Sequence, residues 1–492
     1  MDAFLAKRER LVILLLCFLA AIRIFVYAAA FPLVNPLDEC FHFDMVWKYA
    51  NGHIPRGIEH VDKVMGYELG YYNGGEYLQS PDAMPNGPVV SPPWMMPRKA
   101  IQPYLLRIAA AYVNTPNTET TQPPVYYALA GIWLRLGAIL GIKSGFLLYW
   151  IRFLNVPIFA LTVWMAYVFA RRLYPSIPYM RFAIPLLLTA FPLDVYYGAS
   201  NDVLSPLLFG AGLYCLLVLH MEKRSVLFHA VAGLLVAAAF LTKFTNVGLV
   251  LVLGMLMIPR LVKRADPAKI AILALTAGLP IAAWLIRNKL VMGDFTGSMA
   301  KVAALGWTPK AFGQIWDHPI FRSNGLFVLW REFVTSLWRG ELIWHGTRLA
   351  WKSMDFFYLW SSTLMILAAA IALFGRVKQT KRNDERLVTK TSLGLMAFYT
   401  LFLIAMSVAF DFGNCAYPSL KHPYFSAGRL VSGALIPFLA LYVVGLNVIL
   451  TKAKSRVSGL AVILAITVLT AVSEAVMTAP VFGSAFNFFH LF

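Results

Sequence analysis

Long apolar segments recur along the chain and are separated by short polar stretches. Their lengths are close to the ~20 residues that an α-helix needs to cross the hydrocarbon core of a bilayer. The pattern therefore predicts an all-α polytopic membrane protein with about eleven transmembrane helices. The predicted spans are 11–31, 147–170, 181–198, 203–221, 226–243, 245–260, 269–288, 355–375, 391–410, 428–450 and 458–479.

The apolar segment 124–141 is interpreted differently from the others. As a span it would place Arg171, Arg172 and Arg181 outside and would invert every later loop. As an interfacial helix on the outer surface, it leaves the basic residues of the short loops on one side, which the positive-inside rule identifies as the cytoplasm. The N-terminus is then cytoplasmic and the C-terminus lies outside. The basic residues on the predicted cytoplasmic side are Lys7, Arg8, Arg10, Arg171, Arg172, Arg181, Lys223, Arg224, Arg260, Lys263, Arg264, Lys269, Arg376, Lys378, Lys381, Arg382, Arg386, Lys390, Lys452, Lys454 and Arg456.

Two long segments, 32–146 and 289–354, then lie outside the membrane. The first is rich in proline, glycine and tyrosine, which favours folded loops, and it begins and ends with predicted surface helices at 38–51 and 124–141. The second combines arginines with many tryptophans. Because long outer loops escape the positive-inside rule, membrane orientation does not explain these arginines.

The chain accordingly divides into three parts. We expect a transmembrane module over 1–290 that includes the first outer loop, a second outer loop over 291–354, and C-terminal transmembrane helices over 355–492. The charged stretch 376–390 has the composition of a linker and could separate the first module from the last helices.

Composition agrees with a membrane protein. The 492 residues are 59% hydrophobic and 14% charged, with a mean hydropathy of +0.66, whereas a soluble protein has about 25% charged residues. The net charge of +19 is mostly the basic excess that orients the spans, so it does not indicate a nucleic acid partner. The four cysteines lack metal-binding spacing. Cys40 and Cys415 both fall in predicted outer loops and could pair, although free thiols are the favoured interpretation.

The stretch 35–44 carries the main candidate chemistry. It follows the first span directly and places carboxylates and His42 at a membrane surface, in a chain poor in acid. Acidic groups beside hydrocarbon are costly and usually have a task. Asp38, with Glu39 beside it, could take the proton from an acceptor hydroxyl that attacks a sugar carbon. Alternatively Asp38 caps the helix that starts at Glu39, and the two roles are compatible.

A second candidate is the pair Asn201 and Asp202, in a short predicted outer turn. These residues could orient an acceptor or a metal ion, or they could cap the next helix. Oxygen ligands from Asp38, Glu39 and Asp202 could hold a divalent ion, but nothing in the sequence requires one.

Three cations lie at the predicted outer ends of spans: Lys243, Arg287 and Arg429. The planar fork of arginine suits phosphate oxygens. Together the three side chains would fit an anionic lipid headgroup such as a polyprenyl phosphate. The alternative is that each cation reaches the ordinary lipid phosphates of the bilayer.

In their order and topological placement, these motifs resemble the integral-membrane glycosyltransferases of the GT-C fold, whose members include protein O-mannosyltransferases and lipid A aminoarabinose transferases. The resemblance covers most of the first 300 residues or so. The matching residues are Asp38-Glu39 with His42, Gln122-Pro123-Pro124-Val125-Tyr126-Tyr127, Arg152, Arg171-Arg172, Asn201-Asp202, Lys243, Arg287-Asn288, Gly293-Asp294 and Ala427-Gly428-Arg429.

The resemblance implies a polyprenyl-phosphate donor that carries a single sugar, used on the outer face of a bacterial inner membrane with inversion at the anomeric carbon. It implies Asp38 as the general base. Glu39 and Asp202, with His42 and Asn201 nearby, would orient the acceptor or a metal, and Lys243, Arg287 and Arg429 would bind the donor phosphate. The C-terminal part is short and has no soluble domain, unlike oligosaccharyltransferases, so the acceptor (glycan, lipid or protein) stays open.

Two other functions compete with this one. A transporter or flippase of a lipid-linked sugar would be expected to carry charges at the membrane midplane on broken helices. Most charged residues instead fall at span ends, apart from Arg23 and Arg152, which favours chemistry at the surface. A non-catalytic assembly factor could use the aromatic outer loop for docking, but it would leave the carboxylate cluster without a purpose.

Overall fold

The computed structural model describes residues 8–80, 91–262, 266–374, 383–415, 417–455 and 457–490. Some of the basic residues assigned to the cytoplasmic side lie outside these ranges, as does the first half of the predicted linker 376–390. The basic residues concerned are Lys7, Lys263, Arg264, Arg376, Lys378, Lys381, Arg382 and Arg456.

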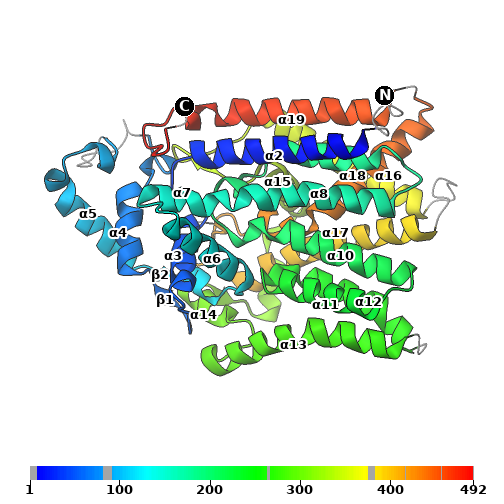
Figure 1. Cartoon of the computed structure of the whole chain (residues 1–492), viewed down its shortest axis with the longest axis horizontal. Coiled ribbons are helices and arrows are strands. Elements are labelled where there is room, and N and C mark those ends of the chain that lie inside the picture. Colours follow the sequence, from blue (N-terminus) through cyan, green and yellow to red (C-terminus); the bar gives the residue numbers. More distant parts are fainter. Residues whose placement is uncertain are drawn as a thin grey trace.

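The protein is a bundle of helices that run side by side along its long axis (Figure 1). Within the described ranges, nine stretches are long and apolar enough to cross a membrane, which confirms the predicted all-α membrane fold. The helices in them are α2 (Glu9–Ala30), α7 with α8 (Gly145–Phe153 and Asn155–Leu173), α10 (Ser205–Met221), α12 (Val247–Val262), α13 (Pro267–Met292), α16 (Lys352–Phe374), α17 (Asn383–Ala409), α18 (Leu435–Lys452) and α19 (Gly459–Phe482).

The other two predicted spans form shorter helices, α9 (Met180–Thr189) and α11 (Val226–Phe240). Helix α9 ends well before the expected residue 198. Pro192 follows closely, and the residue before a proline is disfavoured in the helical conformation. The chain then continues as two short 3₁₀ turns, η5 (Asp194–Tyr197) and η6 (Asn201–Val203). Every residue from 191 to 203 is buried.

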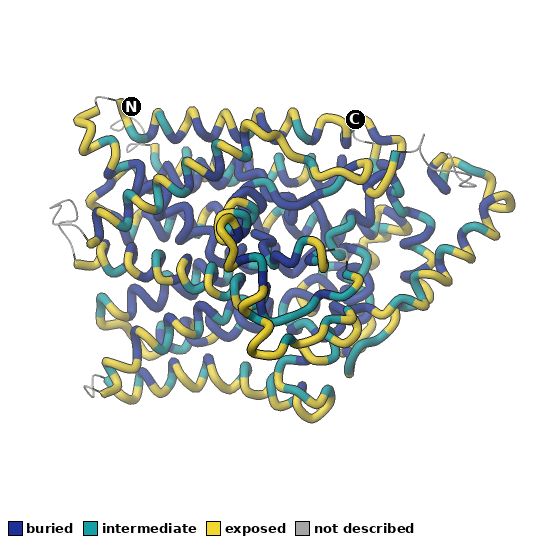
Figure 2. Tube along the Cα trace, turned by 180° about the vertical axis from the view of Figure 1, so that it is seen from behind, coloured by how far each residue is buried: buried dark blue, intermediate teal, exposed yellow. Residues whose placement is uncertain are grey.

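The tenth predicted span, 428–450, also begins irregularly. Its first residues form a 3₁₀ helix, η10 (Gly428–Ala434), with Val431 outside helical geometry, and α18 starts only at Leu435. Helix α18 lies in the middle of the bundle. In the stretch Gly428–Lys452, which contains η10 and α18, 83% of the most apolar 18-residue segment is buried, whereas the corresponding value for α13 at the edge is 17%. Figure 2 shows the same contrast between buried inner helices and an exposed rim.

The first outer segment folds at one end of the bundle (Figure 1). Its helices are α3 (Glu39–Ala50), α4 (Lys63–Tyr72), α5 (Arg98–Val113) and α6 (Val125–Ile139), with 3₁₀ turns η1 (Gly75–Tyr77), η3 (Pro93–Met95) and η4 (Thr118–Thr121). Strands β1 (Glu59–His60) and β2 (Pro116–Asn117) pair antiparallel. Helices α3 and α6 form where the helices 38–51 and 124–141 were predicted, and they pack together at Gly131, where a Cβ would lie 2.9 Å from the Ala50 nitrogen.

The second outer segment was predicted as a loop, but much of it forms helices. It comprises α14 (Ser298–Ala304), η8 (Phe312–Asp317), η9 (Pro319–Phe321), α15 (Gly325–Arg339), the hairpin β4 (Ile343–Trp344) and β5 (Thr347–Arg348), and β3 (Thr308–Pro309), which pairs with β6 (Phe410–Asp411). Helix α15 packs against α16 and η10. It buries Trp338, whose ring stacks on Tyr358 and whose Nε1 donates to Ser362 at 2.9 Å. This tryptophan is therefore part of the core.

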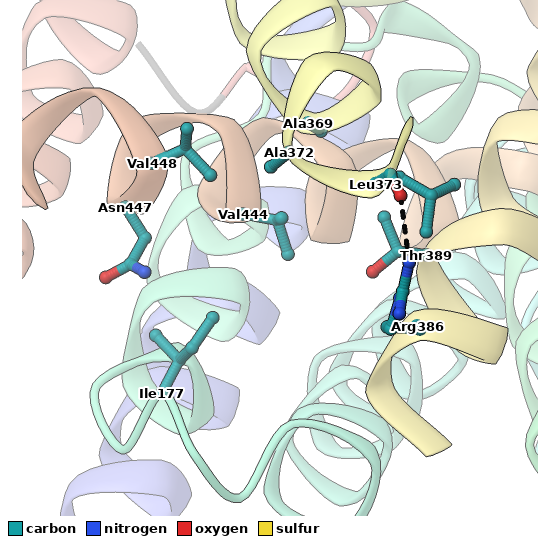
Figure 3. Close-up of a pocket in the computed structure, with 9 residues that line it drawn as sticks. All are labelled: Ile177, Ala369, Ala372, Leu373, Arg386, Thr389, Val444, Asn447 and Val448. Atoms are coloured by element: carbon teal, nitrogen blue, oxygen red, sulfur yellow. Dashed lines mark hydrogen bonds between the residues drawn. The ribbon is translucent and has the colours of Figure 1, made fainter. Parts of the chain in front are cut away.

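A small cavity lies among the ends of α16 and α18, the start of α17 and the α8–α9 loop (Figure 3). Its volume is about 20 Å³, and most of its walls are aliphatic. Arg386 is its only charged lining residue among those described, and its guanidinium donates to the Leu373 carbonyl at 3.2 Å. That carbonyl ends α16, so the contact satisfies an acceptor that the helix leaves free.

Candidate functional site

A much larger cavity, of about 500 Å³, opens among the outer segments. Its walls come from the first outer segment, the turns before α10 and after α11, the second outer segment, and the loop that leads into η10. Such a volume is in the range of small-molecule sites. The charged residues that line it are Asp38, Glu119, Asp202 and Glu341, and Lys243, Lys301, Arg348 and Arg429.

Asp38 precedes α3 but does not cap it. Its backbone is in the left-handed region with φ 68°, and its side chain makes no capping hydrogen bond. The carboxylate instead lies 3.0 Å from Nη2 of Arg429 and keeps 37% of its side chain exposed. Burial raises the pKa of Asp38, but the charges of Arg429 and Lys301 outweigh burial and hold that pKa below its ordinary value. The carboxylate is therefore ionised at neutral pH.

The Arg429 guanidinium lies within 4 Å of three carboxylates. Besides Asp38, its guanidinium lies 3.9 Å from Oδ2 of Asp202 and 3.6 Å from Oε2 of Glu341. The irregular start of η10 carries the side chain into the cavity wall. One cation therefore joins the first outer loop, the turn before α10 and the second outer segment.

The pair predicted at 201–202 joins the same site. Oδ1 of Asp202 accepts a hydrogen bond from the Lys243 ammonium, and its Oδ2 lies 3.1 Å from the Ser200 hydroxyl. Asn201 lines the cavity, and its amide donates to Gln122 at 3.4 Å. Lys243 starts the 3₁₀ turn η7 (Phe244–Asn246) between α11 and α12, and it is buried. The structure thus brings together Asp38, Asp202, Lys243 and Arg429.

His42 also lines the cavity. It is buried one turn into α3, and its Nδ1 lies 2.8 Å from the Tyr127 hydroxyl of α6. Burial lowers the pKa of His42 more than the nearby carboxylates raise it. The imidazole is therefore neutral at pH 7.

Sequence reasoning missed a third ion pair in the cavity, between Glu119 of η4 and Lys301 of α14. Their Oε1 and Nζ atoms are 2.6 Å apart. Burial raises the pKa of Glu119, but the charge of Lys301 opposes burial, and the pKa lies below its ordinary value. The two residues lie in different outer segments, and neither follows a recognisable motif, so the sequence offered no signal that they meet.

Glu341 was also missed. It is buried, and its Oε1 has no hydrogen-bond partner among the described residues. Burial raises the pKa of Glu341, opposed chiefly by Arg429. The buried carboxylate of Asp194 holds this segment in place, because it accepts the backbone N–H groups of Glu341 at 2.7 Å and Leu342 at 2.6 Å.

Glu39 lies outside the cavity lining. Both its oxygens face Arg152 of α7, at 2.6 and 2.7 Å, in a fully buried pair. They also accept the backbone N–H groups of Asn35 and Ala199, each at 2.9 Å. Arg152 in turn donates to carbonyls at the end of α2, including that of Phe31 at 2.6 Å. The pair therefore fixes the backbone that leads to Asp38.

Arg287 lies apart from the other two cations proposed for phosphate. Its guanidinium donates to the Pro55 carbonyl and lies 4.8 Å from the centre of the Trp284 ring. It is absent from the lining of the large cavity.

The described residues hold no cluster of three or more histidine, cysteine or acidic side chains arranged to bind a metal ion. The carboxylates of the large cavity face lysine or arginine instead. Cys40 and Cys415 are free thiols.

Two kinds of solved membrane protein are similar to this chain. The oligosaccharyltransferase of Archaeoglobus fulgidus has a TM-score of 0.40 and 13% identity, over 75% of this chain and 44% of that one. ArnT of Cupriavidus metallidurans has a TM-score of 0.34 and 14% identity in its apo state, over 89% of this chain and 78% of that one. Its form bound to undecaprenyl phosphate has a TM-score of 0.35 and 12% identity, over 95% and 88%. The chain thus spans less than half the length of the oligosaccharyltransferase.

No curated protein matches the sequence significantly. A family described as "Predicted membrane protein (DUF2142)" matches residues 18–418. Because that match covers most of the 492 residues, this chain belongs to the DUF2142 family of membrane proteins.

Proposed function

We propose that this protein is a membrane glycosyltransferase that moves a single sugar from a polyprenyl-phosphate donor to an acceptor hydroxyl at the outer face of a bacterial inner membrane. The observation that carries the proposal is the cavity in which Asp38 faces Arg429 beside the pairs Asp202–Lys243 and Glu119–Lys301. An ionised carboxylate and several cations in one cavity suit the transfer of a group away from a phosphate.

The reaction balances with these groups. The acceptor oxygen attacks the anomeric carbon of the sugar while the Asp38 carboxylate takes the hydroxyl proton. The bond between that carbon and the phosphate oxygen breaks, and polyprenyl phosphate leaves with the electron pair. Attack opposite the leaving group inverts the anomeric centre. Because the leaving group is a phosphate, a base with a low pKa is sufficient.

Arg429, Lys243 and Lys301 would bind and neutralise the donor phosphate. Each already faces a carboxylate, which lessens the cost of burying a cation before the donor arrives. Asp202, Asn201 and the neutral His42 would orient the acceptor. We assign Glu39 to positioning, because Arg152 occupies both its oxygens, and we leave Arg287 out of the phosphate site.

The test is transfer by the full-length protein in nanodiscs with polyprenyl-phosphate sugars as donors. The readout is acceptor-dependent release of polyprenyl phosphate. Asp38→Asn should lower this release at least ~100-fold, the usual scale of a general base. The matched control is Asp317→Asn, since Asp317 is an exposed carboxylate of the second outer segment and does not line the large cavity.

Normal release by a folded Asp38→Asn variant would remove Asp38 from the chemistry. If no donor releases its lipid phosphate, yet the protein moves a lipid-linked sugar between leaflets of a vesicle, the protein is a flippase and the proposal is wrong.

A further inference from the structure

Asp38 lines a second cavity as well as the large one. This smaller cavity has a volume of about 240 Å³, and it is formed by the chain before and within α3 together with parts of α4, α5 and η1. The two cavities share Pro36, Asp38 and Leu78 in their walls. The carboxylate thus lies where the cavities meet.

The two cavities differ in charge. Four cations line the large one, whereas Asp38 is the only charged side chain among the described residues that line the small one. A phosphate in the small cavity would lie beside the Asp38 carboxylate, and none of the described residues that line this cavity is a cation that could compensate the phosphate charge, which is costly. An anionic donor therefore belongs in the large cavity, and the small one suits an uncharged group.

The small cavity presents amides and hydroxyls. The hydroxyl proton of Tyr77 cannot bind a ligand, because it is donated to the Pro32 carbonyl at 2.6 Å. The Asn73 amide donates to the Tyr112 hydroxyl at 2.8 Å, which leaves the tyrosine proton and the amide oxygen for other partners. Phe41 supplies an aromatic wall. Amide, hydroxyl and aromatic groups together match the alternating hydroxyl and C–H faces of a sugar.

We propose that the small cavity binds the acceptor and that the acceptor group is a neutral sugar residue held by Asn73 and Tyr112. The inference rests on the proposed function, since it takes Asp38 as the base that the acceptor hydroxyl must reach. The volume is just below the ~300 Å³ lower limit of typical small-molecule pockets, so it fits one sugar ring and would leave a serine or threonine side chain loosely held.

Cysteine protection tests the assignment without requiring transfer. Cys415 lines the large cavity, and Cys40 lines the small one. The background carries Cys17→Ala and Cys215→Ala, so that these two thiols alone react with a maleimide in the full-length protein in nanodiscs. Undecaprenyl phosphate should slow labelling of Cys415 at least tenfold and leave Cys40 unchanged. The neutral probe n-octyl β-D-glucoside should do the reverse, and its 6-phosphate should not protect Cys40.

The outcomes separate the two ideas. If undecaprenyl phosphate protects neither thiol, the donor site and with it the proposed function fail. If it protects Cys40, or if the glucoside fails to protect Cys40, the acceptor assignment is wrong while the donor site stands. Protection by the 6-phosphate as strong as that by the glucoside would overturn the claim that the acceptor is neutral.

Kinetics give a second measure. Tyr112→Phe and Asn73→Leu should raise the KM for the glucoside about tenfold, the value of one hydrogen bond, and should raise the KM for the donor much less. Asn114→Leu is the control, because Asn114 is exposed at the end of α5 outside both cavities. Equal effects on both KM values would show a general loss of structure and would contradict an acceptor site.

Discussion

Asp38 and Glu39 are adjacent carboxylates with opposite surroundings. Asp38 is partly exposed in two cavities and faces a cation that also serves two other acids. Glu39 is fully buried, and every contact it makes holds backbone or Arg152. Two neighbouring acids can therefore take different roles, because environment and not residue type decides which one can react.

Glu39→Gln should destabilise the protein by about 3–5 kcal/mol, because the buried Arg152 would lose its counter-charge. Thermal unfolding of the purified variant measures the effect. Glu59→Gln is the matched control, since Glu59 pairs with the exposed His53 and such a pair is worth about 0–1 kcal/mol. A variant of normal stability without transfer activity would instead make Glu39 a catalytic residue.

Asp38 and Glu119 should take up protons only at low pH. The folded pKa values of Asp38 and Glu119 lie below their ordinary values, so their ion pairs stabilise the protein above pH ~4 and are lost as pH falls through the folded pKa values. The kcat/KM for transfer should stay level from pH 8 down to about 5. A fall between pH 7 and 6 would show that a different group acts as the base.

At the scale of elements, the site forms where regular helices stop. Helix α9 ends early and η10 delays α18, and these irregular segments carry Asp202 and Arg429 to the cavity. Gly340 does the same for the second outer segment. Its φ of 79° and ψ of −160° are accessible to glycine alone, and a Cβ there would overlap the Asp194 carboxylate.

Gly340→Ala should therefore lower stability by at least ~1–2 kcal/mol from the backbone alone. It should also reduce transfer, because it displaces the turn that Asp194 holds against Glu341. Thermal unfolding and the transfer assay measure the two effects. Gly278→Ala is the control, since nothing lies within 4 Å of a Cβ at that position in α13. Equal, small effects of both variants would show that the turn tolerates a side chain.

Long apolar runs were predictable because length alone distinguishes a span. Asp38 was recognisable because it follows such a run directly. Glu119, Lys301 and Glu341 were not, because tertiary packing of two long outer segments brings them together and leaves no local periodicity. The early end of α9 had a signal in Pro192, which the apolar residues around it obscured.

At the scale of the whole molecule, α3 to α6 and α14 lie at one end of the bundle, and α8 runs away from them to the opposite end (Figure 1). The arginines at the end of α8 pair there with Glu9 and Glu222. This separation agrees with the predicted orientation, in which the reaction occurs outside the cell membrane and the basic loops face the cytoplasm.

Cysteine labelling should reveal that orientation. In a cysteine-free background, a membrane-impermeant maleimide should label Asp317→Cys in intact cells and label Lys223→Cys only after permeabilisation. Both positions are exposed, so access decides the result. Labelling in the reverse order would invert the topology and place the cavities in the cytoplasm.

The contact between Arg429 and Asp38 joins residues 391 positions apart. A ribosome that has made the first 420 residues or so has therefore completed nearly every wall of the cavity but not the guanidinium on which three acids converge. A copy of the chain that ends before residue 429 therefore cannot assemble the charge arrangement of this cavity.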